Sequence, residues 1–361
     1  MKILYTITGL SMGGAETITV NLARCMQQFG HIVHIMYLSG EQIVNVPDEI
    51  SVHGLHMRKT PLGLIKTLRK AKRIVQKFRP EIVHANMFHA IVFSRLLRLF
   101  VKIPHLICTE HSNNYHGKTR LILEHCTDFL SDLNTNVSQT ATDYFVTSGV
   151  FSQKKSIAMY NGIDMNRFFK NRNTILRQQL KLADNDFVFI NVSRFNKAKD
   201  HKTLIDAFYI VHQKKQNTKL ICVGDGELRT EIQILVESLK LSDWVIFAGI
   251  RQNLHDYYNA SDCFVLSSAY EGFGLVLVEA MACELPVIST DCGGTKEIIA
   301  NKNDLIPIKN PELLADKMLE VMNYTAEQKE IIGRENRTAV EKFDLNKITE
   351  KWEKLYKEKL V

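Results

Sequence analysis

The sequence predicts an α/β protein of two domains, each built around a parallel sheet. Its 361 residues exceed the roughly 250–300 at which a single hydrophobic core usually stops growing. Short apolar runs alternate with amphipathic stretches in both halves, as expected of strands joined by helices. The charge is uneven, since residues 1–170 carry +9 and the remainder −2. We place the first domain at residues 1–168, the second at 169–340 and a last helix at 341–361.

The composition excludes several classes of protein. With 24% charged and 45% hydrophobic residues, the chain has the balance of a soluble globular protein, and no run of eighteen apolar residues predicts a membrane span. The start of the chain is too short and too polar for a secretory signal. Seven scattered cysteines without a C-x-x-C pair predict buried thiols in a reducing cytoplasm, not disulfides or a zinc site.

In the first half, two places at strand ends could meet a ligand. Gly13 and Gly14, in the loop after the first strand, would let a phosphate approach the backbone, although a tight turn explains them equally well. His111 follows a later strand, where ligands of open α/β sheets bind. Most histidines in this histidine-rich half are merely packed or exposed. The strands are predicted at Ile3–Thr8, Ile32–Leu38, Ile82–Asn86, Leu106–Ser112, Leu133–Ser138 and Ser156–Tyr160, with a helix at Ala15–Phe29.

A basic stretch from Arg58 to Arg79 holds nine Lys and Arg and no acidic residue. Its apolar residues recur at helical spacing, so we predict a helix with a basic outer face. The face could simply be solvated, or it could bind anionic lipid, which we favour. The segment Phe93–Lys102 mixes apolar and basic residues in the same way and is interpreted alike. No nucleic-acid-binding motif accompanies the charge, and we expect no nucleic acid partner.

The second half places cations and glycines at strand ends. Arg194 and Lys199 lie in a strand-to-helix loop and could both reach a diphosphate, or could be ordinary loop cations. The pairs Gly224-Asp225 and Gly249-Ile250 end two further strands and suit backbone contact with a base and its ribose. The predicted elements are the strands Phe187–Val192, Leu220–Val223, Trp244–Phe247, Cys263–Leu266 and Leu285–Ser289, with helices at Thr203–Gln213 and Leu275–Ala282.

Two glutamates, Glu271 and Glu279, flank the turn and helix that follow one of these strands. A carboxylate that accepts two adjacent hydroxyls suits a sugar or a ribose, and the open N–H groups of the helix suit a diphosphate. A cap and a solvated face would explain the two glutamates equally well on spacing alone. The backbone and side chains expected to meet such a ligand here are those of Gly272, Phe273, Gly274, Leu275 and Val276.

The order of motifs resembles the retaining glycosyltransferases of family 4, which have the GT-B fold. The pattern E-G-F-G-x-x-x-x-E is preceded by N-A-S-D and followed by P-V-I-S-T-D-x-G-G-x-x-E, while S-x-G-G-A-E and E-H-S-N occur in the first half. The resemblance implies two Rossmann-like domains facing across a cleft, with the last helix returning to the first domain. It also implies the bacterial type that builds surface polysaccharide, capsule, lipopolysaccharide or lipid-linked oligosaccharide.

The resemblance further implies a hexosyltransferase that moves a sugar from a nucleotide-sugar, UDP-linked by preference, with the anomeric configuration retained. Arg194 and Lys199 would hold the diphosphate together with Gly14, Glu279 the ribose, and Glu271 and His111 the sugar. No metal or other cofactor is expected, and no D-x-D triplet of the metal-dependent GT-A type occurs. The expected acceptor is an undecaprenyl-diphosphate-linked glycan at the inner face of the cytoplasmic membrane. The alternatives are a nucleotide-sugar 2-epimerase of the same fold and a non-catalytic scaffold subunit.

Overall fold

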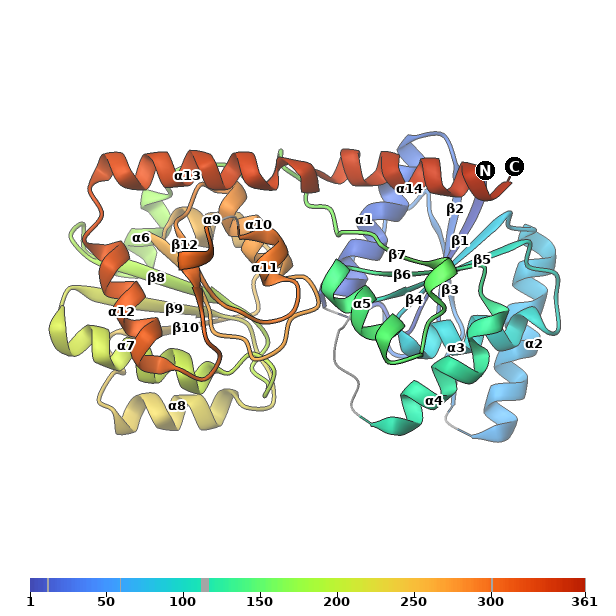
Figure 1. Cartoon of the computed structure of the whole chain (residues 1–361), viewed down its shortest axis with the longest axis horizontal. Helices are drawn as coiled ribbons and strands as arrows, with labels where there is room; N and C mark the ends of the chain where they lie inside the picture. The colour runs from blue at the N-terminus through green and yellow to red at the C-terminus, as the bar shows by residue number, and fades with distance from the viewer. Residues whose placement is uncertain (12, 59, 112–116, 300, 361) are drawn as a thin grey trace. The chain divides into compact units, whose positions relative to one another are not determined.

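The computed structural model describes residues 1–11, 13–58, 60–111, 117–299 and 301–360. The chain forms two compact units, each with its own sheet (Figure 1). Unit 1 comprises Met1–Gly162 and Leu345–Val361, and unit 2 comprises Ile163–Asp344.

Unit 1 is a seven-stranded sheet in the order β3-β2-β1-β4-β5-β6-β7, and all its neighbouring strands are parallel. The six strands predicted for this half are confirmed, with small shifts at their ends, and β3 is additional. The strands are β1 Lys2–Ile7, β2 Ile32–Tyr37, β3 Ser51–Gly54, β4 Ile82–Asn86, β5 His105–Glu110, β6 Leu133–Asn136 and β7 Ser156–Ala158. The helices are α1 Gly14–Gln28, α2 Pro61–Phe78, α3 Phe88–Arg98, α4 Lys118–Thr127, α5 Gln139–Thr147 and α14 Leu345–Leu360.

Two hydrophobic clusters cover the two faces of this sheet. Side chains alternate along a strand, so Ile3 and Tyr5 of β1 pack with α1 and α14, while Leu4 packs with α2 and α3 on the opposite face. The last helix is held by polar contacts as well, since the Tyr5 and Tyr356 hydroxyl groups lie 3.2 Å apart within the core. The strands are therefore buried on both sides, as parallel sheets require.

Unit 2 is a six-stranded parallel sheet in the order β10-β9-β8-β11-β12-β13. The five predicted strands are confirmed, and the two-residue β13 is additional. The strands are β8 Phe187–Val192, β9 Thr218–Val223, β10 Val245–Gly249, β11 Cys263–Leu266, β12 Val287–Thr290 and β13 Leu305–Ile306. The helices are α6 Thr174–Gln179, α7 His201–Lys214, α8 Arg229–Ser238, α9 Leu254–Asn259, α10 Leu275–Ala282, α11 Thr295–Ile298, α12 Pro311–Met322 and α13 Ala326–Val340.

Each strand order reverses once, and the reversal marks where a ligand fits. In unit 1 the chain winds outward in opposite directions from β1 and β4, and in unit 2 from β8 and β11. Crossover helices leave a crevice at the carboxyl ends of the two strands at such a switch point. The loops that follow β8 and β11 carry Lys199 and Glu271 respectively. Topology therefore brings two of the predicted site residues to one place.

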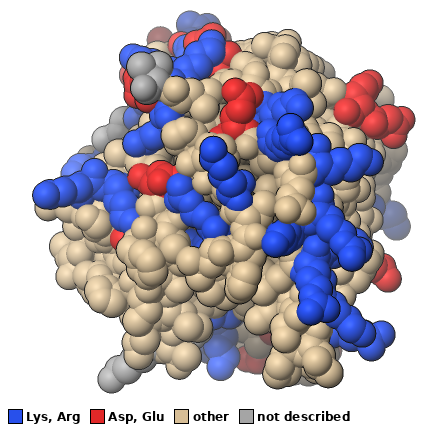
Figure 2. Space-filling model, turned by 90° about the vertical axis from the view of Figure 1, so that its right-hand side faces the viewer, with Lys and Arg blue, Asp and Glu red and all other residues tan. Residues whose placement is uncertain are grey.

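The helix predicted in the basic stretch is confirmed as α2. Thr60 caps its start by accepting a hydrogen bond from the Gly63 amide, and Arg79 ends it in a left-handed conformation. Five basic side chains of this helix are exposed. Ile65 is one of the apolar residues at helical spacing that we expect to pack inward, but it is 46% exposed. Lys59 lies outside the described residues. Figure 2 shows Lys and Arg side chains gathered in a band on the face that carries α2 in Figure 1. The exposed basic residues of α2 are Lys66, Arg69, Lys70, Arg73 and Lys77. No described helix is both long and apolar enough to cross a lipid bilayer.

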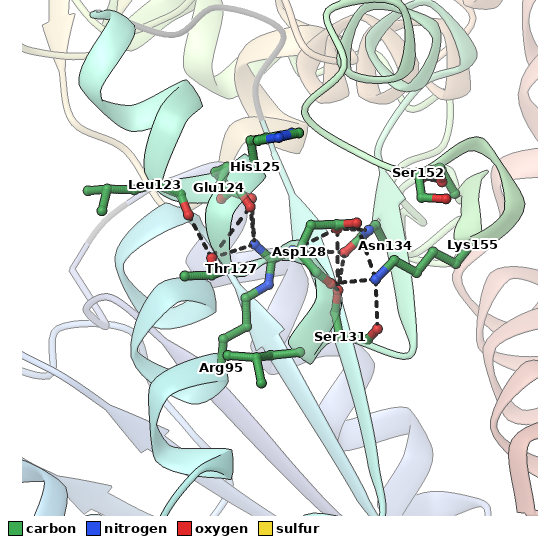
Figure 3. A network of polar contacts seen from close by, with 12 residues as sticks. Arg95, Leu123, Glu124, His125, Thr127, Asp128, Ser131, Asn134, Ser152 and Lys155 are labelled. Carbon is green, nitrogen blue, oxygen red and sulfur yellow. Dashed lines mark hydrogen bonds and ion pairs between the residues drawn. The ribbon is translucent and has the colours of Figure 1, made fainter.

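The interpretation of Phe93–Lys102 as a second basic surface is wrong at its centre. Arg95, on α3, is fully buried. It donates hydrogen bonds to Glu124 at 3.0 Å and to Asn134 at 3.0 Å (Figure 3). Its guanidinium also forms an ion pair with Asp128 at 3.4 Å. Burial raises the pKa of Glu124, and the charge of Arg95 opposes that rise. Arg95 is therefore a core residue that ties α3 to α4 and β6.

Candidate active site

The site in unit 2 is built by two loops that are held together by hydrogen bonds to backbone carbonyl groups. The amide of Ala269, after β11, donates to the carbonyl of Ala198 at 2.8 Å. One residue further on, the carbonyl of Lys199 accepts a hydrogen bond from the Ser267 hydroxyl at 3.0 Å. These bonds fix the loop after β8 against the loop after β11, so their side chains meet at the switch point.

Lys199 and Glu271 form an ion pair at this point. The Lys199 ammonium donates to Oε1 of Glu271 at 2.5 Å, and the Ser268 hydroxyl donates to the same oxygen at 2.9 Å. The Glu271 side chain is 8% exposed and that of Lys199 is 22% exposed, so the pair is largely desolvated but reachable from solvent. An ammonium group has three donors, and Glu271 is its one acceptor among the described residues. Lys199 can therefore bind an anion without leaving Glu271.

Helix α10 begins beside this pair with an open N-terminus. Gly274 precedes the helix at φ 99°, a left-handed conformation that favours glycine. No side chain of the described residues caps the helix, so the amide groups of Leu275 and Val276 in its first turn are available to an anion. These amides and the positive end of the helix dipole suit a phosphate group.

Glu279 lies in the second turn of α10 and is 8% exposed. Its Oε2 accepts a hydrogen bond from the Tyr258 hydroxyl of α9 at 2.9 Å. Burial raises the pKa of Glu279 to about 7, while the Tyr258 hydrogen bond and the charge of Arg167 act in the opposite direction. Glu271 and Glu279 thus have separate surroundings, one paired with a lysine and the other with a tyrosine.

Arg194 does not join the Lys199 pair. Its side chain is 71% exposed and forms an ion pair with Glu227, 58% exposed, at 3.5 Å. An exposed pair of this kind is weak, so Arg194 is free to turn toward a ligand. Asp225 is also exposed, and its carboxylate accepts a hydrogen bond from the Gly226 amide at 2.8 Å.

Several of the remaining predicted residues have structural roles in this unit. Gly224 has φ 135°, and a Cβ there would lie 2.0 Å from the Ser193 carbonyl oxygen, so the close packing of two loops requires glycine. The Gly224 amide donates to the carbonyl of Gly249 at 2.9 Å, which places the loops after β9 and β10 together. Phe273 is buried against Phe343, with ring centroids 5.1 Å apart. Gly272 is partly exposed and Ile250 is 55% exposed, so both can meet a ligand.

In unit 1, His111 lies beside a small cavity of about 20 Å³ at the carboxyl ends of β4 and β5. The amide nitrogen of Asn86 donates to the carbonyl of His84. The amide oxygen, Oδ1, can only accept, so it accepts a hydrogen bond from Nε2–H of His111 at 3.0 Å. Burial lowers the pKa of His111 to about 4, so the ring is neutral near pH 7. The Nδ1 of His111 is buried and has no partner among the described residues. A hydroxyl group could donate to this nitrogen.

The glycine loop of unit 1 is only partly described. A Cβ on Gly13 would lie 2.4 Å from a carboxylate oxygen of Glu16, whereas Gly14 has open space around its Cα. Gly14 can therefore approach a ligand more freely than Gly13. Met12 of the S-x-G-G-A-E motif and Ser112 and Asn113 of E-H-S-N lie outside the described residues.

Three residues of these sites were not singled out from the sequence: Asn86, Tyr258 and Ser268. Ser268 lies three residues before Glu271, and side chains at this spacing can hydrogen-bond within a turn. The sequence could therefore have indicated this contact. Asn86 ends a predicted strand next to the one that leads to His111, so the sheet-edge rule could have found it. Tyr258 lies 21 residues from Glu279, and nothing in the sequence links the two.

Two family models match the chain in succession. The model described as Glycosyltransferase Family 4 matches residues 12–167, and the model described as Glycosyl transferases group 1 matches residues 172–338. Together they span most of both units.

Similar proteins come from several bacteria. The N-acetyl-alpha-D-glucosaminyl L-malate synthase of Bacillus anthracis is 26% identical, over 99% of this chain and 97% of that protein. The N-acetylgalactosamine-N,N'-diacetylbacillosaminyl-diphospho-undecaprenol 4-alpha-N-acetylgalactosaminyltransferase of Campylobacter jejuni is 25% identical, over 83% of this chain and 84% of that protein. The crystal structure of Anabaena Alr3699/HepE in complex with UDP and glucose superposes with a TM-score of 0.86 at 23% identity, covering 99% of this chain and 100% of that one.

Proposed function

The chain belongs to the glycosyltransferases, and we propose that it transfers a hexose from a UDP-sugar to a hydroxyl group of a lipid-linked glycan, with the anomeric configuration retained. Its first domain matches family 4, its second domain matches group 1, and it has the GT-B fold. The observation that carries this proposal is the Lys199–Glu271 pair at the switch point of unit 2, beside the uncapped start of α10. The pair offers a cation for a diphosphate and a carboxylate for a sugar hydroxyl.

The donor and acceptor classes are supported by the named relatives. The Anabaena structure contains UDP and glucose, which favours a UDP-linked donor. The name of the Campylobacter relative includes a diphospho-undecaprenol acceptor, which favours a lipid-linked glycan and a role in surface polysaccharide synthesis. We infer that Glu279 holds the ribose and Glu271 the sugar. His111 is proposed for the sugar because its Nδ1 can accept a hydroxyl hydrogen.

The proposed transfer takes place on one face of the sugar. The acceptor oxygen forms a bond to the anomeric carbon as the bond from that carbon to the diphosphate breaks, and a phosphate oxygen takes the acceptor's proton. No side chain is needed as nucleophile or base. Lys199, Arg194 and the α10 amides stabilise the negative charge that develops on the leaving diphosphate, so we propose that the reaction needs no metal ion.

A transfer assay tests this function. The protein is incubated in EDTA with a panel of UDP-hexoses and UDP-N-acetylhexosamines and an undecaprenyl-diphosphate-linked acceptor, and the linkage of the product is read by NMR. We expect one UDP-sugar to give a product with an α linkage from an α-linked donor. A β product would overturn retention, and dependence on a divalent metal would overturn metal independence. Interconversion of two UDP-sugars without acceptor would favour the epimerase.

The exposed basic face of α2 supports binding at the inner surface of an anionic membrane, where the lipid-linked acceptor lies. We expect replacement of Lys66, Arg69, Arg73 and Lys77 by glutamine to weaken binding to phosphatidylglycerol vesicles about 10³-fold, at about 1 kcal/mol per charge near the surface. Lys70 is left in place because it donates to the Gly54 carbonyl oxygen. Vesicle sedimentation measures the change.

A matched control for this membrane contact removes four exposed lysines of α14. The control variant replaces Lys347, Lys351, Lys354 and Lys357 by glutamine and so has the same net charge. It should keep vesicle binding close to that of the wild type. Equal loss in both variants would show that net charge, and not the α2 face, governs binding.

A further inference from the structure

Tyr258 connects two elements of unit 2 at the proposed ribose site. Its ring is fully buried and contacts the rings of Phe168 and Phe264, with centroids 6.1 Å and 6.0 Å away. Both contacts are edge-to-face, so the ring has little freedom to turn. Its hydroxyl is thereby held within reach of Glu279 and, at 3.4 Å, of the Val276 carbonyl oxygen.

The hydrogen bond between Tyr258 and Glu279 runs in one direction. Burial raises the pKa of the Tyr258 hydroxyl well above 10, so it keeps its proton and donates. Oε2 of Glu279 accepts that bond, and Oε1 accepts none from any described residue. One oxygen of the carboxylate is therefore fixed and the other is left for a ligand.

The ionisation of Glu279 depends on few neighbours. The groups that act on it are the Tyr258 hydroxyl of α9 and the Arg167 guanidinium of the segment before α6, and both favour the ionised carboxylate. The Cys283 thiol, one turn further along α10, lies close enough to sense the same carboxylate. Burial opposes ionisation most strongly, and this leaves the pKa near 7. Small changes in the surroundings then decide whether the group is charged at neutral pH.

We propose that Tyr258 is a positioning residue for the donor: its hydroxyl holds Oε2 of Glu279 so that the ionised carboxylate presents Oε1 to the hydroxyl groups of the donor's ribose. This inference rests on the proposed function, because it takes the ligand to be a uridine nucleotide. A protonated Glu279 has lost its charge and accepts hydrogen bonds poorly, so ribose binding and ionisation are linked. Tyr258 favours both, because a hydrogen bond to a carboxylate stabilises its ionised form.

Calorimetric titration of UDP from pH 6 to pH 9 tests this role on the full chain. In the wild type we expect UDP affinity to rise about tenfold between pH 6 and pH 8, as Glu279 loses its proton. In Tyr258→Phe the rise should move upward by about one to two pH units. Affinity should then fall about tenfold at pH 7.5 and by a smaller factor above pH 9, where Glu279 is ionised but no longer held by the Tyr258 hydroxyl.

Two controls separate positioning from packing and from the ligand's own ionisation. Tyr257→Phe removes a hydroxyl from the neighbouring buried tyrosine, which makes no hydrogen bond to Glu279, and should leave the pH profile unchanged. In Glu279→Gln the UDP phosphate still ionises, with a pKa of about 6, but residue 279 no longer has a group that titrates. The excess pH dependence of the wild type over this variant belongs to Glu279.

The outcomes are distinct. A Tyr258→Phe profile with the wild-type midpoint overturns the positioning role, and so does an equal loss of affinity at every pH, which would indicate packing alone. A wild type that fails to bind UDP at any pH overturns the proposed function, and the role of Tyr258 falls with it.

Discussion

We expect Lys199→Ala to lower the turnover number about 10²–10³-fold, the usual loss when one donor that stabilises transition-state charge is removed. The reason is that Lys199 is the largely desolvated cation at the switch point, with two ammonium hydrogens still available for the leaving diphosphate. Because that charge grows as the bond to the sugar breaks, kcat should fall more than KM rises. Steady-state kinetics with the donor identified in the transfer assay measures the effect.

The substitution also leaves Glu271 without its cation, so two further variants accompany it. Lys199→Gln keeps a hydrogen-bond donor toward Glu271 without the charge, and it should lose turnover to a similar degree while unfolding at the wild-type temperature. Lys197→Ala removes an exposed lysine two residues away and should change neither constant. Unchanged turnover in Lys199→Ala would remove Lys199 from the site.

We expect Arg95→Met to destabilise unit 1 by about 3–5 kcal/mol, because it leaves the buried carboxylate of Glu124 without its cation. Asp128 is less affected, since Lys155 forms a second ion pair with it at 3.2 Å. Urea denaturation, with amide hydrogen exchange to locate the change in unit 1, measures the loss.

A double variant and a surface variant complete the test of Arg95. Arg95→Met combined with Glu124→Gln removes both charges and should recover much of the lost stability. Arg98→Met breaks a partly exposed pair with Asp132 and should destabilise the unit by about 1 kcal/mol or less. A loss in Arg95→Met no larger than that in Arg98→Met would contradict the assignment of Arg95 to the core.

Most strands could be predicted from the sequence because they are buried on both faces and therefore appear as continuous apolar runs. β3, Ser51–Gly54, was missed because it is a short edge strand with two polar residues and only partial burial. Arg95 was misplaced for a different reason. Helical periodicity indicates that Arg95 lies on a helix, but its partners, Glu124 and Asp128, lie 29 and 33 residues further along the chain. Only the folded structure shows that they surround it.

The candidate site was predictable in its residues but not in its pairings. The sequence places Lys199 and Glu271 after two strands, and the strand order of unit 2 then makes those strands neighbours. Their ion pair, and the contrast with the tyrosine-bound Glu279, depends on side-chain packing between segments 72 and 21 residues apart. Gly224 illustrates the reverse case, since the glycine expected to meet a base is required by the Ser193 carbonyl oxygen.

Unit 2 is proposed to bind uridine diphosphate without a metal ion, and the shift in melting temperature with UDP, GDP and ADP, each in EDTA, measures that binding. Ligand at a hundred times its dissociation constant adds about 2.7 kcal/mol of stability, enough to raise the melting temperature by several degrees. We expect UDP alone to do so, and Glu279→Ala to lose the response. Stabilisation by GDP or ADP in place of UDP, or no response to any of the three, would contradict a uridine nucleotide site in unit 2.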